Sequence, residues 1–538
     1  VQGKAVGHGW WVAVGSTTSR RATIGGLDPS TRYRFRVAVK HGKSWAYGGP
    51  SASVRPLTPV APPAPTPTPP TPTPGPTPGA PTDWTPPVVP AGTTIWVNGS
   101  AGLDTNPGTQ TRPVATITEA WNRIPSSTTL STSVRILVRA GTYADTTSPG
   151  YWENRWGTTS APITLEAIDG AHTVRLLGDM NVFNVRHLWV SGIDIIRNGD
   201  AFHCERCSYL TISGVHFDGG GGAQETIKVN QSDHIDIVSS DIAAAYDNAI
   251  DYVAVQHSLI SGNRIHDAQG WCAYVKGGSA YITVSTNDIY DCGEGGFTAG
   301  QGTGFEFMVA PWLRYEAYGV TVTDNIIHDV WGAGLGVNGS YNVVMAFNTL
   351  YRIGTRSHAV EFVHGARGCD GNTAQCALNL AAGGWGALDG GGQWIPSKHV
   401  YFVNNIVYNP AGVQTAWQHF AVADPATAPL DSGVPNPSLA DDDLQIHGNV
   451  ISNGGPDMNT GLADPAKSAN LLATNWVNVM VPALRNPAAG DFRPTPGGNV
   501  AGLPSVTIPT LVWADAGLAV PGDGSPTINT SRPPGALR

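Results

Sequence analysis

The sequence predicts an all-β protein whose main part is a solenoid of stacked coils. The phrase Asn-x-Ile-His/Tyr-Asp occurs at residues 263–267, 287–291 and 325–329, and it returns with drift at 348–352 and 405–409. Glycine and proline number 66 and 42, which favours many tight turns, and charged residues make up only 13% of the chain. A repeat with a period of about 23 residues is typical of a solenoid, in which each coil packs on the next.

The N-terminal part is predicted to be separate from the solenoid. A chain of 538 residues is expected to hold at least two modules. Apolar residues alternate around Tyr33, Phe35 and Val37 after a Leu-Asp-Pro turn, and residues 1–59 resemble the second half of a fibronectin type III domain, a partial β-sandwich. Residues 60–92 are rich in proline and threonine and are expected to form an extended linker.

Residues 93–485 are predicted to form the solenoid. The stretch TIWVNGSAGLDTNPGTQTRPVATITEAW, which starts at Thr94, resembles the opening of pectin-lyase-like right-handed parallel β-helix proteins. That resemblance implies a short helix through Ile117, Ala120 and Trp121 that caps the open end of the core. Residues 486–538 are expected to form a tail that packs on the β-helix or caps it.

The repeated asparagine is predicted to form a ladder of stacked side-chain amides along the turns, with the following apolar residue pointing inward. Asn263, Asn287, Asn325, Asn348 and Asn405 are separated by 24, 38, 23 and 57 residues. The two long intervals exceed one coil by roughly 15 and 34 residues. These insertions, at about 299–319 and 364–397, are expected to project from one face and to wall a cleft.

Charge and cysteine content bear on partners and location. A net charge of -9 argues against nucleic acid binding, and no apolar run is long enough to span a bilayer. The six cysteines are predicted to form three local disulfides, Cys204 with Cys207, Cys272 with Cys292 and Cys369 with Cys376, which favours a secreted or cell-surface protein. Zinc bound by the Cys204-x-x-Cys207 pair is the alternative. Any signal peptide is expected to lie outside this sequence, which begins with Val.

Candidate site residues gather on three consecutive coils. Asp251 lies twelve residues before Asn263 and Lys276 lies eleven before Asn287, so the two are expected to be near neighbours on adjacent strands. Glu225 and Lys228 lie one coil earlier. Lys228 is predicted to be a paired surface lysine.

The motifs DNAID (247–251) and YVKGG (274–278) resemble the acidic and lysine elements of calcium-dependent polysaccharide lyases of the pectate lyase family nine type. The resemblance implies Ca²⁺ held by Glu225, Asp247, Asn248 and Asp251, with Lys276 as the catalytic base. Asn248 stands where that family has aspartate, which lowers the charge of the ligand set.

The implied reaction is β-elimination from an acidic polysaccharide. Removal of the proton next to a uronate carboxylate needs a base and a cation, and oxygen ligands of this kind are those that calcium prefers. Arg314 is a candidate clamp for the substrate carboxylate, with an ion pair to Glu316 as the alternative. His358, Glu361 and His364 alternate along a predicted strand, where they either face the same cleft or are satisfied structural groups.

Two other functions compete with the lyase. A glycoside hydrolase on the same fold would use two carboxylates such as Asp247 and Asp251. A non-catalytic surface protein or adhesin would fit the incomplete N-terminal module, through which it could self-associate, and four sequons at Asn98, Asn230, Asn338 and Asn529.

Overall fold

A computed structural model describes residues 2–5, 12–13, 33–41, 44–47, 88–222, 224–388, 394–429, 432–455, 458–511, 513 and 532–536. The chain divides into two units, Val1–Pro74 and Gly75–Arg538. In the first unit, β1 (Gln2–Ala5) pairs antiparallel with β2 (Val12–Ala13) and β3 (Tyr33–Arg36), and β4 (Ala38–His41) pairs with β5 (Ser44–Tyr47). The fibronectin-like interpretation and the linker rest largely on positions outside the described residues, and both stay predictions.

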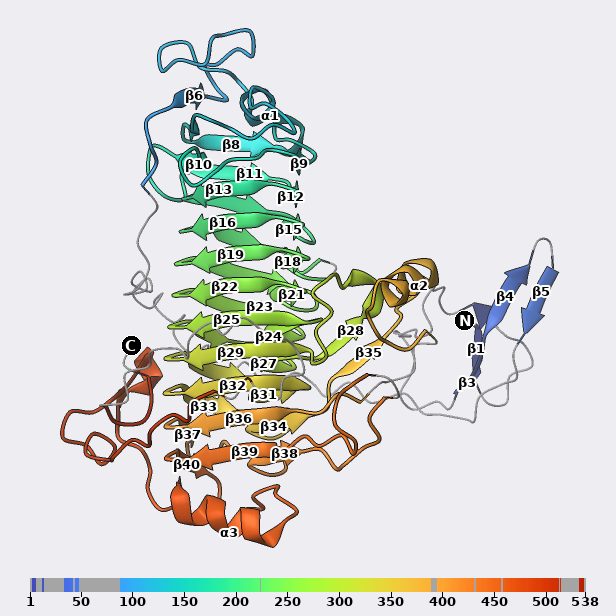
Figure 1. Ribbon diagram of the computed structural model, residues 1–538, viewed down its shortest axis with the longest axis vertical. Coiled ribbons are helices and arrows are strands. Elements are labelled where there is room, and N and C mark those ends of the chain that lie inside the picture. Colours follow the sequence, from blue (N-terminus) through green and yellow to red (C-terminus); the bar gives the residue numbers. More distant parts are fainter. Residues whose placement is uncertain are drawn as a thin grey trace. The chain divides into compact units, whose positions relative to one another are not determined.

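The second unit is an all-β, right-handed parallel β-helix, which confirms the predicted fold class (Figure 1). Each coil contributes one strand to each of three parallel sheets, which we call the first, second and third sheet in the order in which the chain visits them. Neighbouring strands in a sheet therefore come from successive coils, and residues of one sheet face are brought together at intervals of one coil.

The first sheet contains β6 (Thr93–Val97), β7 (Val134–Val138), β10 (Ile163–Ala167), β13 (Arg186–Ser191), β16 (Ser208–Ser213), β19 (Asp233–Val238), β22 (Gln256–Ser261), β25 (Ser279–Ser285), β29 (Ala317–Thr323), β32 (Ser340–Ala346), β36 (Lys398–Val403) and β39 (Asp442–His447). The second contains β8 (Gly141–Ala144), β11 (Val174–Leu177), β14 (Ile193–Ile196), β17 (His216–Asp218), β20 (Asp241–Ala245), β23 (Arg264–Ala268), β26 (Asp288–Tyr290), β30 (Ile326–Val330), β33 (Thr349–Ile353), β37 (Ile406–Asn409), β40 (Val450–Asn453) and β41 (Trp476–Val477). The third contains β9 (Trp152–Glu153), β12 (Met180–Phe183), β15 (Phe202–Glu205), β18 (Ile227–Asn230), β21 (Ile250–Val253), β24 (Trp271–Lys276), β27 (Gly295–Ala299), β31 (Ala333–Asn338), β34 (Val360–Val363) and β38 (Phe420–Val422).

The interior of the shaft is one apolar core that runs from Ile95 to Leu471. At one end, α1 (Ile117–Asn122) buries Ile117, Ala120 and Trp121, as the sequence predicted, and Thr116 caps its N-terminus. At the other end lies α3 (Pro465–Thr474), which begins at the cap residue Asp464 and buries Leu471 (Figure 1). Two short 3-10 turns, η1 (Asp145–Thr147) and η3 (Pro487–Ala489), lie in connections. No helix in the described ranges is long and apolar enough to cross a bilayer.

The asparagine ladder is confirmed. The amide nitrogen of each of the five asparagines donates to the side-chain oxygen of the asparagine one coil further on, at 2.9–3.0 Å. The ladder continues through Asn449 to Asn475. Each side chain also bonds backbone groups of the neighbouring coil, so turn amides that are shielded from water are satisfied.

The outward part of the repeated phrase forms a second ladder, which the sequence analysis did not foresee. The rings of His266, Tyr290 and His328 stack with centroids 4.6 and 4.9 Å apart on the outer face of the second sheet. The aspartate that follows each histidine accepts a hydrogen bond from its Nδ1 atom, as Asp329 does from His328. The asparagine, the ring and the aspartate after each histidine thus all have structural contacts.

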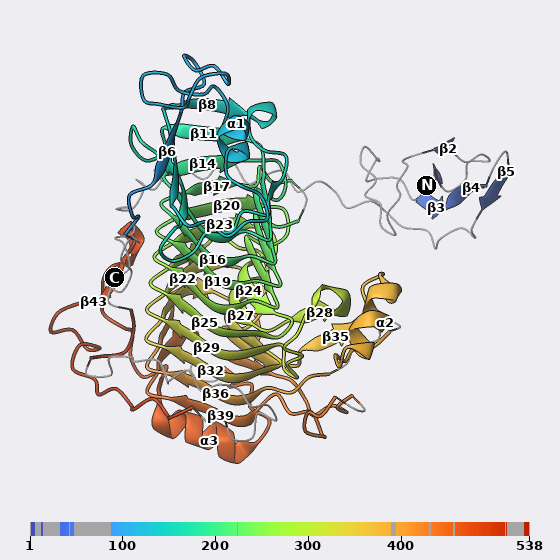
Figure 2. The ribbon, with the colours of Figure 1, turned by 45° about the horizontal axis from the view of Figure 1, so that its top comes forward.

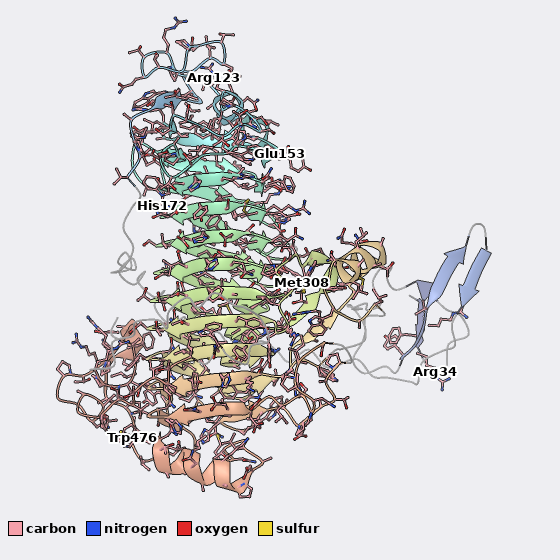
Figure 3. The ribbon with its side chains drawn as sticks, viewed as in Figure 1. Arg34, Arg123, Glu153, His172, Met308 and Trp476 are labelled. Carbon is pink, nitrogen blue, oxygen red and sulfur yellow. A yellow bond between two sulfur atoms is a disulfide. The ribbon has the colours of Figure 1, made fainter. Side chains whose placement is uncertain are left out.

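Both insertions project to the same side of the shaft (Figures 1 and 2). The first carries β28 (Gly302–Gly304) and the turn η2 (Phe305–Phe307), and Met308, labelled in Figure 3, follows that turn. The second carries β35 (Ala366–Gly368) and α2 (Thr373–Ala381), a helix that the sequence analysis did not predict. Because β28 pairs with β35 in parallel, the two insertions form one projecting body.

The segment after the last coil packs on the outer faces of the first and second sheets. Its hairpin of β42 (Leu484–Asn486) and β43 (Asp491–Pro494) places Phe492 against His328 on the second sheet. Further on, Leu511 and Trp513 pack on the first sheet. The two insertions instead follow strands of the third sheet, because β28 comes after β27 and β35 comes after β34.

Candidate functional site

The candidate residues come together on the outer face of the third sheet. Strand register places Lys228 of β18 opposite Asp251 of β21, and Asp251 opposite Tyr274 of β24. Lys276 lies opposite Val253, two positions beyond Asp251 and therefore on the same face. The prediction that Lys276 and Asp251 are on adjacent strands is correct, but they are diagonal neighbours and the position opposite Asp251 belongs to Tyr274.

Lys228 is the centre of the acidic cluster. Its Nζ atom lies 3.0 Å from Asp251 and 3.3 Å from Glu225. Asp251 is only 2% exposed and Glu225 only 6%, so both carboxylates are shielded from water. Lys228 is paired, as predicted, but its side chain is four-fifths buried and so is not a surface lysine.

The cluster shifts the protonation of its members. Burial raises the pKa of Glu225 to about 7, and the charge of Asp251 acts in the same direction. Burial alone would lower the pKa of Lys228, but the carboxylates of Asp251 and Glu225 outweigh it and raise that pKa. A carboxyl group with a pKa near 7 can act as a general acid or base.

Asp200 and His203 extend this cluster by one coil, and the sequence analysis missed both. Burial raises the pKa of Asp200 and lowers that of His203. His203 lies opposite Lys228 in the ladder. The signal that could have found them is their spacing, because each lies 25 residues, or one coil, before Glu225 or Lys228.

Asn248 is held by neighbouring groups at both ends of its amide. Its oxygen accepts the backbone N–H of Trp271 at 2.9 Å, and its nitrogen donates to the hydroxyl of Tyr274 at 3.1 Å. Asp247, the adjacent residue, is exposed. The two members of the DNAID motif that were expected to bind one ion beside Asp251 therefore have different surroundings.

The arrangement of the predicted calcium ligands differs from the coordination shell that calcium needs. Calcium takes six to eight oxygen ligands around one point. Here the carboxylate oxygens of Glu225, Asp247 and Asp251 do not all lie within 4.8 Å of one another, and the Lys228 ammonium contacts two of them. As these side chains lie, the set does not fit a calcium ion unless Lys228 moves away.

Lys276 has a different environment from Lys228. Its Nζ atom donates to the hydroxyl of Tyr274 at 3.3 Å and to Oε1 of Gln301 at 3.1 Å, and it lies 4.3 Å from the centre of the Tyr274 ring. Among the described residues, no carboxylate forms an ion pair with it. Gln301 belongs to the first insertion, so the amine lies where that insertion leaves the shaft.

Tyr274 links the two halves of the site, and the sequence analysis missed its contribution. Burial, and after it the charges of Asp251 and Glu225, raise the pKa of Tyr274 well above its ordinary value. The tyrosine is therefore a neutral hydroxyl at ordinary pH. Its place two residues before Lys276 on one strand was a usable signal, since alternate residues share a face.

The structure places Arg314 away from the partner that the alternative gave it. Its guanidinium donates to the carbonyl oxygen of Gly433 at 2.9 Å. The ion pair proposed between Arg314 and Glu316 is wrong, because Glu316 pairs with Arg367 at 2.8 Å and both side chains are fully buried. A clamp on substrate remains a prediction for Arg314.

His358, Glu361 and His364 contact the third sheet's later coils. Glu361 accepts a hydrogen bond from His358 at 3.2 Å and lies in the same outward column as Asp251 and Tyr274, three strands beyond β24. His364 contacts the carbonyl oxygen of Ser438, and burial lowers its pKa. The first two are thus on the face of the candidate site.

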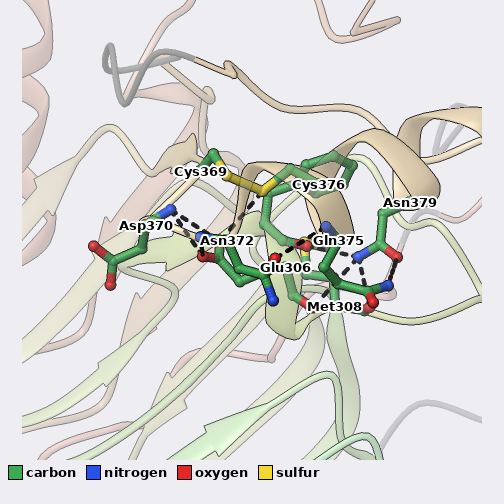
Figure 4. The surroundings of a disulfide bond; sticks show 9 residues. Glu306, Met308, Cys369, Asp370, Asn372, Gln375, Cys376 and Asn379 are labelled. Carbon is green, nitrogen blue, oxygen red and sulfur yellow. Dashed lines mark hydrogen bonds between the residues drawn. A yellow bond between two sulfur atoms is a disulfide. The ribbon is translucent and has the colours of Figure 1, made fainter.

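The predicted disulfides are present. Cys204 is bonded to Cys207, which removes the thiolates that zinc would need, and Cys272 is bonded to Cys292. The Cys369–Cys376 bond closes the start of α2 in the second insertion (Figure 4).

The disulfide of the second insertion lies against the first. The Glu306 carboxylate accepts the backbone N–H groups of Asp370 and Asn372, and these bonds outweigh burial to lower its pKa. Asn379 donates to the carbonyl oxygens of Phe305 and Met308 (Figure 4). Side chains therefore lock the two insertions together beyond the pairing of β28 with β35.

Comparisons with known proteins agree with the fold. A family model described as "Right handed beta helix region" matches residues 200–407. No curated protein sequence matches the chain. A solved rhamnogalacturonan lyase is similar at 12% identity with a TM-score of 0.45, and it is aligned over 72% of this chain and 100% of its own.

Two other solved structures are similar over two thirds of the chain or more. The A-module of the Azotobacter vinelandii mannuronan C-5 epimerase AlgE4 has 14% identity and a TM-score of 0.35, over 67% of this chain and 98% of its own. The pectate lyase Pel9A has 12% identity and a TM-score of 0.34, over 79% and 94%. At these levels of identity and TM-score, the similarity supports no inference about the activity of this chain. The chain is a right-handed parallel β-helix protein with an acidic, lysine-containing site on its third sheet.

Proposed function

We propose that the chain is an exported polysaccharide lyase that cleaves a uronate-containing polymer by β-elimination, with Lys276 as the base. The observation that carries the proposal is the contrast between the two lysines of the site. Two carboxylates hold the charge of Lys228, whereas the hydrogen bonds of Lys276 within the described residues go to the neutral side chains of Tyr274 and Gln301. The three disulfides support an oxidising compartment, secreted or at the cell surface.

The roles follow from the positions of the groups. The amine of Lys276 takes the proton from the carbon next to the uronate carboxylate. The released electron pair forms the carbon–carbon double bond as the bond to the glycosidic oxygen breaks, and that oxygen takes up a proton from water. The hydroxyl of Tyr274, which stays protonated, holds the amine in place. Calcium binding by Glu225, Asp247, Asn248 and Asp251 is an untested expectation of the sequence resemblance, and no step above depends on it.

The direct test is product formation from a panel of uronate polymers such as polygalacturonate and alginate. A lyase produces an unsaturated sugar end that absorbs in the ultraviolet, whereas hydrolysis does not. Lys276→Ala is expected to lower the rate by about 10²–10⁴-fold, the usual contribution of a general base. Lys467→Ala, which removes an exposed lysine paired with Asp441, is the matched control and should keep full activity. Full activity in Lys276→Ala would refute the assignment.

A glycoside hydrolase is the second candidate, because Glu225 has the pKa of a general acid and lies beside a second carboxylate, Asp251. This reading predicts new reducing ends without ultraviolet absorbance. Glu225→Gln should then abolish cleavage while Lys276→Ala leaves it largely unchanged, which is the opposite of the lyase result.

A further inference from the structure

The ammonium of Lys228 lies between Glu225 and Asp251, two of the residues for which the motif resemblance implied a calcium ion. It contacts two deeply buried carboxylates of the site, Glu225 and Asp251, and it comes from β18, the strand between those of His203 and Asp251. We infer that Lys228 is the permanent cation of this site and takes the place of calcium, so that the wild-type protein does not need the ion. The inference deepens the proposed lyase function and rests on the same site.

The charge balance supports this assignment. Two buried carboxylates without a counter-ion would strongly destabilise the fold. One ammonium at 3.0–3.3 Å from both offsets one of their two negative charges and forms a charge-assisted hydrogen bond with each. A divalent ion placed beside that ammonium would meet its repulsion at short range. Lysine and calcium are therefore alternative occupants of one position.

The remaining oxygens do not complete a calcium shell. The Asn248 oxygen accepts the backbone N–H of Trp271, and Asp247 is exposed to solvent, whereas Glu225 and Asp251 are buried. The lyase family that the DNAID motif resembles has aspartate at the position of Asn248. The asparagine therefore removes one negative charge from the ligand set. The missing carboxylate at Asn248 and the ammonium of Lys228 both weaken the attraction of this site for a divalent cation.

One observation favours calcium binding at this site. Oδ1 of Asp251 is buried and has no hydrogen-bond partner in the described part of the chain. An ion would bind there if it bound at all, together with Glu225. This makes a direct measurement of calcium binding to the wild-type protein decisive.

The experiment is calorimetric titration of the full chain with CaCl₂, together with thermal unfolding in CaCl₂ and in EDTA. The wild-type protein is expected to show no binding heat up to about 1 mM, the weak end of the range for extracellular calcium modules, and the same melting temperature in both solutions. Lys228→Met removes the charge and keeps the side-chain length. Its melting temperature should fall in EDTA and rise again with CaCl₂, because calcium binds the freed carboxylates.

Two further variants control this result. Lys228→Arg keeps the charge and should stay indifferent to calcium, and Lys467→Met should behave as the wild type because that lysine is exposed and pairs with Asp441. Calcium heat in the wild type that disappears in Asp251→Asn would overturn the inference. A folded Lys228→Met that ignores calcium would overturn it too, and if that variant does not fold, the wild-type titration decides alone. None of these measurements uses substrate, so their failure is distinct from failure of the lyase proposal.

Discussion

Glu316 and Arg367 form a fully buried ion pair that joins the two insertions to the strand of Lys276. The guanidinium of Arg367 contacts Oε1 of Glu316 at 2.8 Å, while Oε2 accepts the backbone N–H of Gly277 at 3.0 Å and the hydroxyl of Thr303. Gly277 directly follows Lys276. The carboxylate thus ties the first insertion, the second insertion and the residue next to the proposed base.

Arg367→Met is therefore expected to damage both stability and activity. Removing one partner of a buried ion pair leaves an uncompensated charge and costs about 3–5 kcal/mol. Unfolding in urea measures the loss, and lyase activity should fall because the turn after Lys276 loses its anchor. Arg314→Met is the matched control for stability: its guanidinium is half-buried and makes one hydrogen bond to Gly433, so the change should stay below about 1.5 kcal/mol. Equal losses in the two variants would contradict the anchor.

Tyr274→Phe tests whether the tyrosine holds the base. The variant keeps the ring under the Lys276 amine but removes the hydroxyl that accepts from Lys276 and from Asn248. We expect kcat to fall about tenfold, with KM nearly unchanged, because positioning of the base matters in the chemical step and less in binding. Steady-state kinetics with the polymer identified by the product screen provide the measurement. A change in KM alone would assign Tyr274 to substrate binding instead.

Asn287→Ala tests the ladder. The side chain of Asn287 accepts from the backbone N–H of Asn263 and donates to the carbonyl oxygen of Ile260, so its loss leaves buried backbone groups unpaired. The expected cost in the free energy of unfolding is about 3 kcal/mol. Asn459→Ala is the control, since its exposed side chain accepts one local hydrogen bond, from the backbone of Gly461, and its loss should change the free energy by less than about 0.5 kcal/mol. Similar costs at both positions would mean that the ladder adds nothing specific.

The sequence predicted the shaft because the ladder is a signal of spacing. Asn263 and Asn287 are 24 residues apart and repeat one chemical role, so coil length, inward side chains and the two insertions could all be read from intervals. The insertions themselves have no period. Their pairing through Glu316 and Arg367, and the helix α2, could not be predicted for that reason.

The register of the site was harder to predict than the fold. Asp251 lies twelve residues before Asn263, and Lys276 lies eleven before Asn287. This count places Lys276 one residue along the strand from the position opposite Asp251, so that the two side chains would point to opposite faces of the sheet. The true offset is two, because the turn at Gly277 and Gly278 is one residue longer than the turn one coil before it. Both glycines have positive φ, 63° and 80°, which accommodates that turn.

The partners of Lys228 were missed for a related reason. The coil that holds it precedes the first ladder asparagine, and Ser240 takes the ladder position there. No reference asparagine was therefore available for counting. The interval of 23 residues between Lys228 and Asp251 was the remaining signal, and it equals one coil.

The stacked histidines predict that the shaft loses stability in mildly alkaline solution. Burial alone would lower the pKa of His328, but the carboxylates of Asp288 and Asp329 outweigh it and raise the pKa to about 9. An unfolded histidine titrates near 6.5, so the charged form favours the folded state. The stabilisation is fully present below about pH 6.5 and is lost as the pH rises to about 9, a loss of up to about 3 kcal/mol.

His328→Tyr separates this effect from other pH-dependent groups. The solenoid itself uses tyrosine in the same column, at Tyr290 and Tyr351, so the variant keeps the stack and removes the titrating ring. Urea unfolding at several pH values should show a shallower fall between about pH 6.5 and 9 than in the wild type. His172→Gln, at an exposed position labelled in Figure 3, should keep the wild-type fall. If the free energy of unfolding of His328→Tyr falls with pH as steeply as that of the wild type, the loss of stability does not arise from His328.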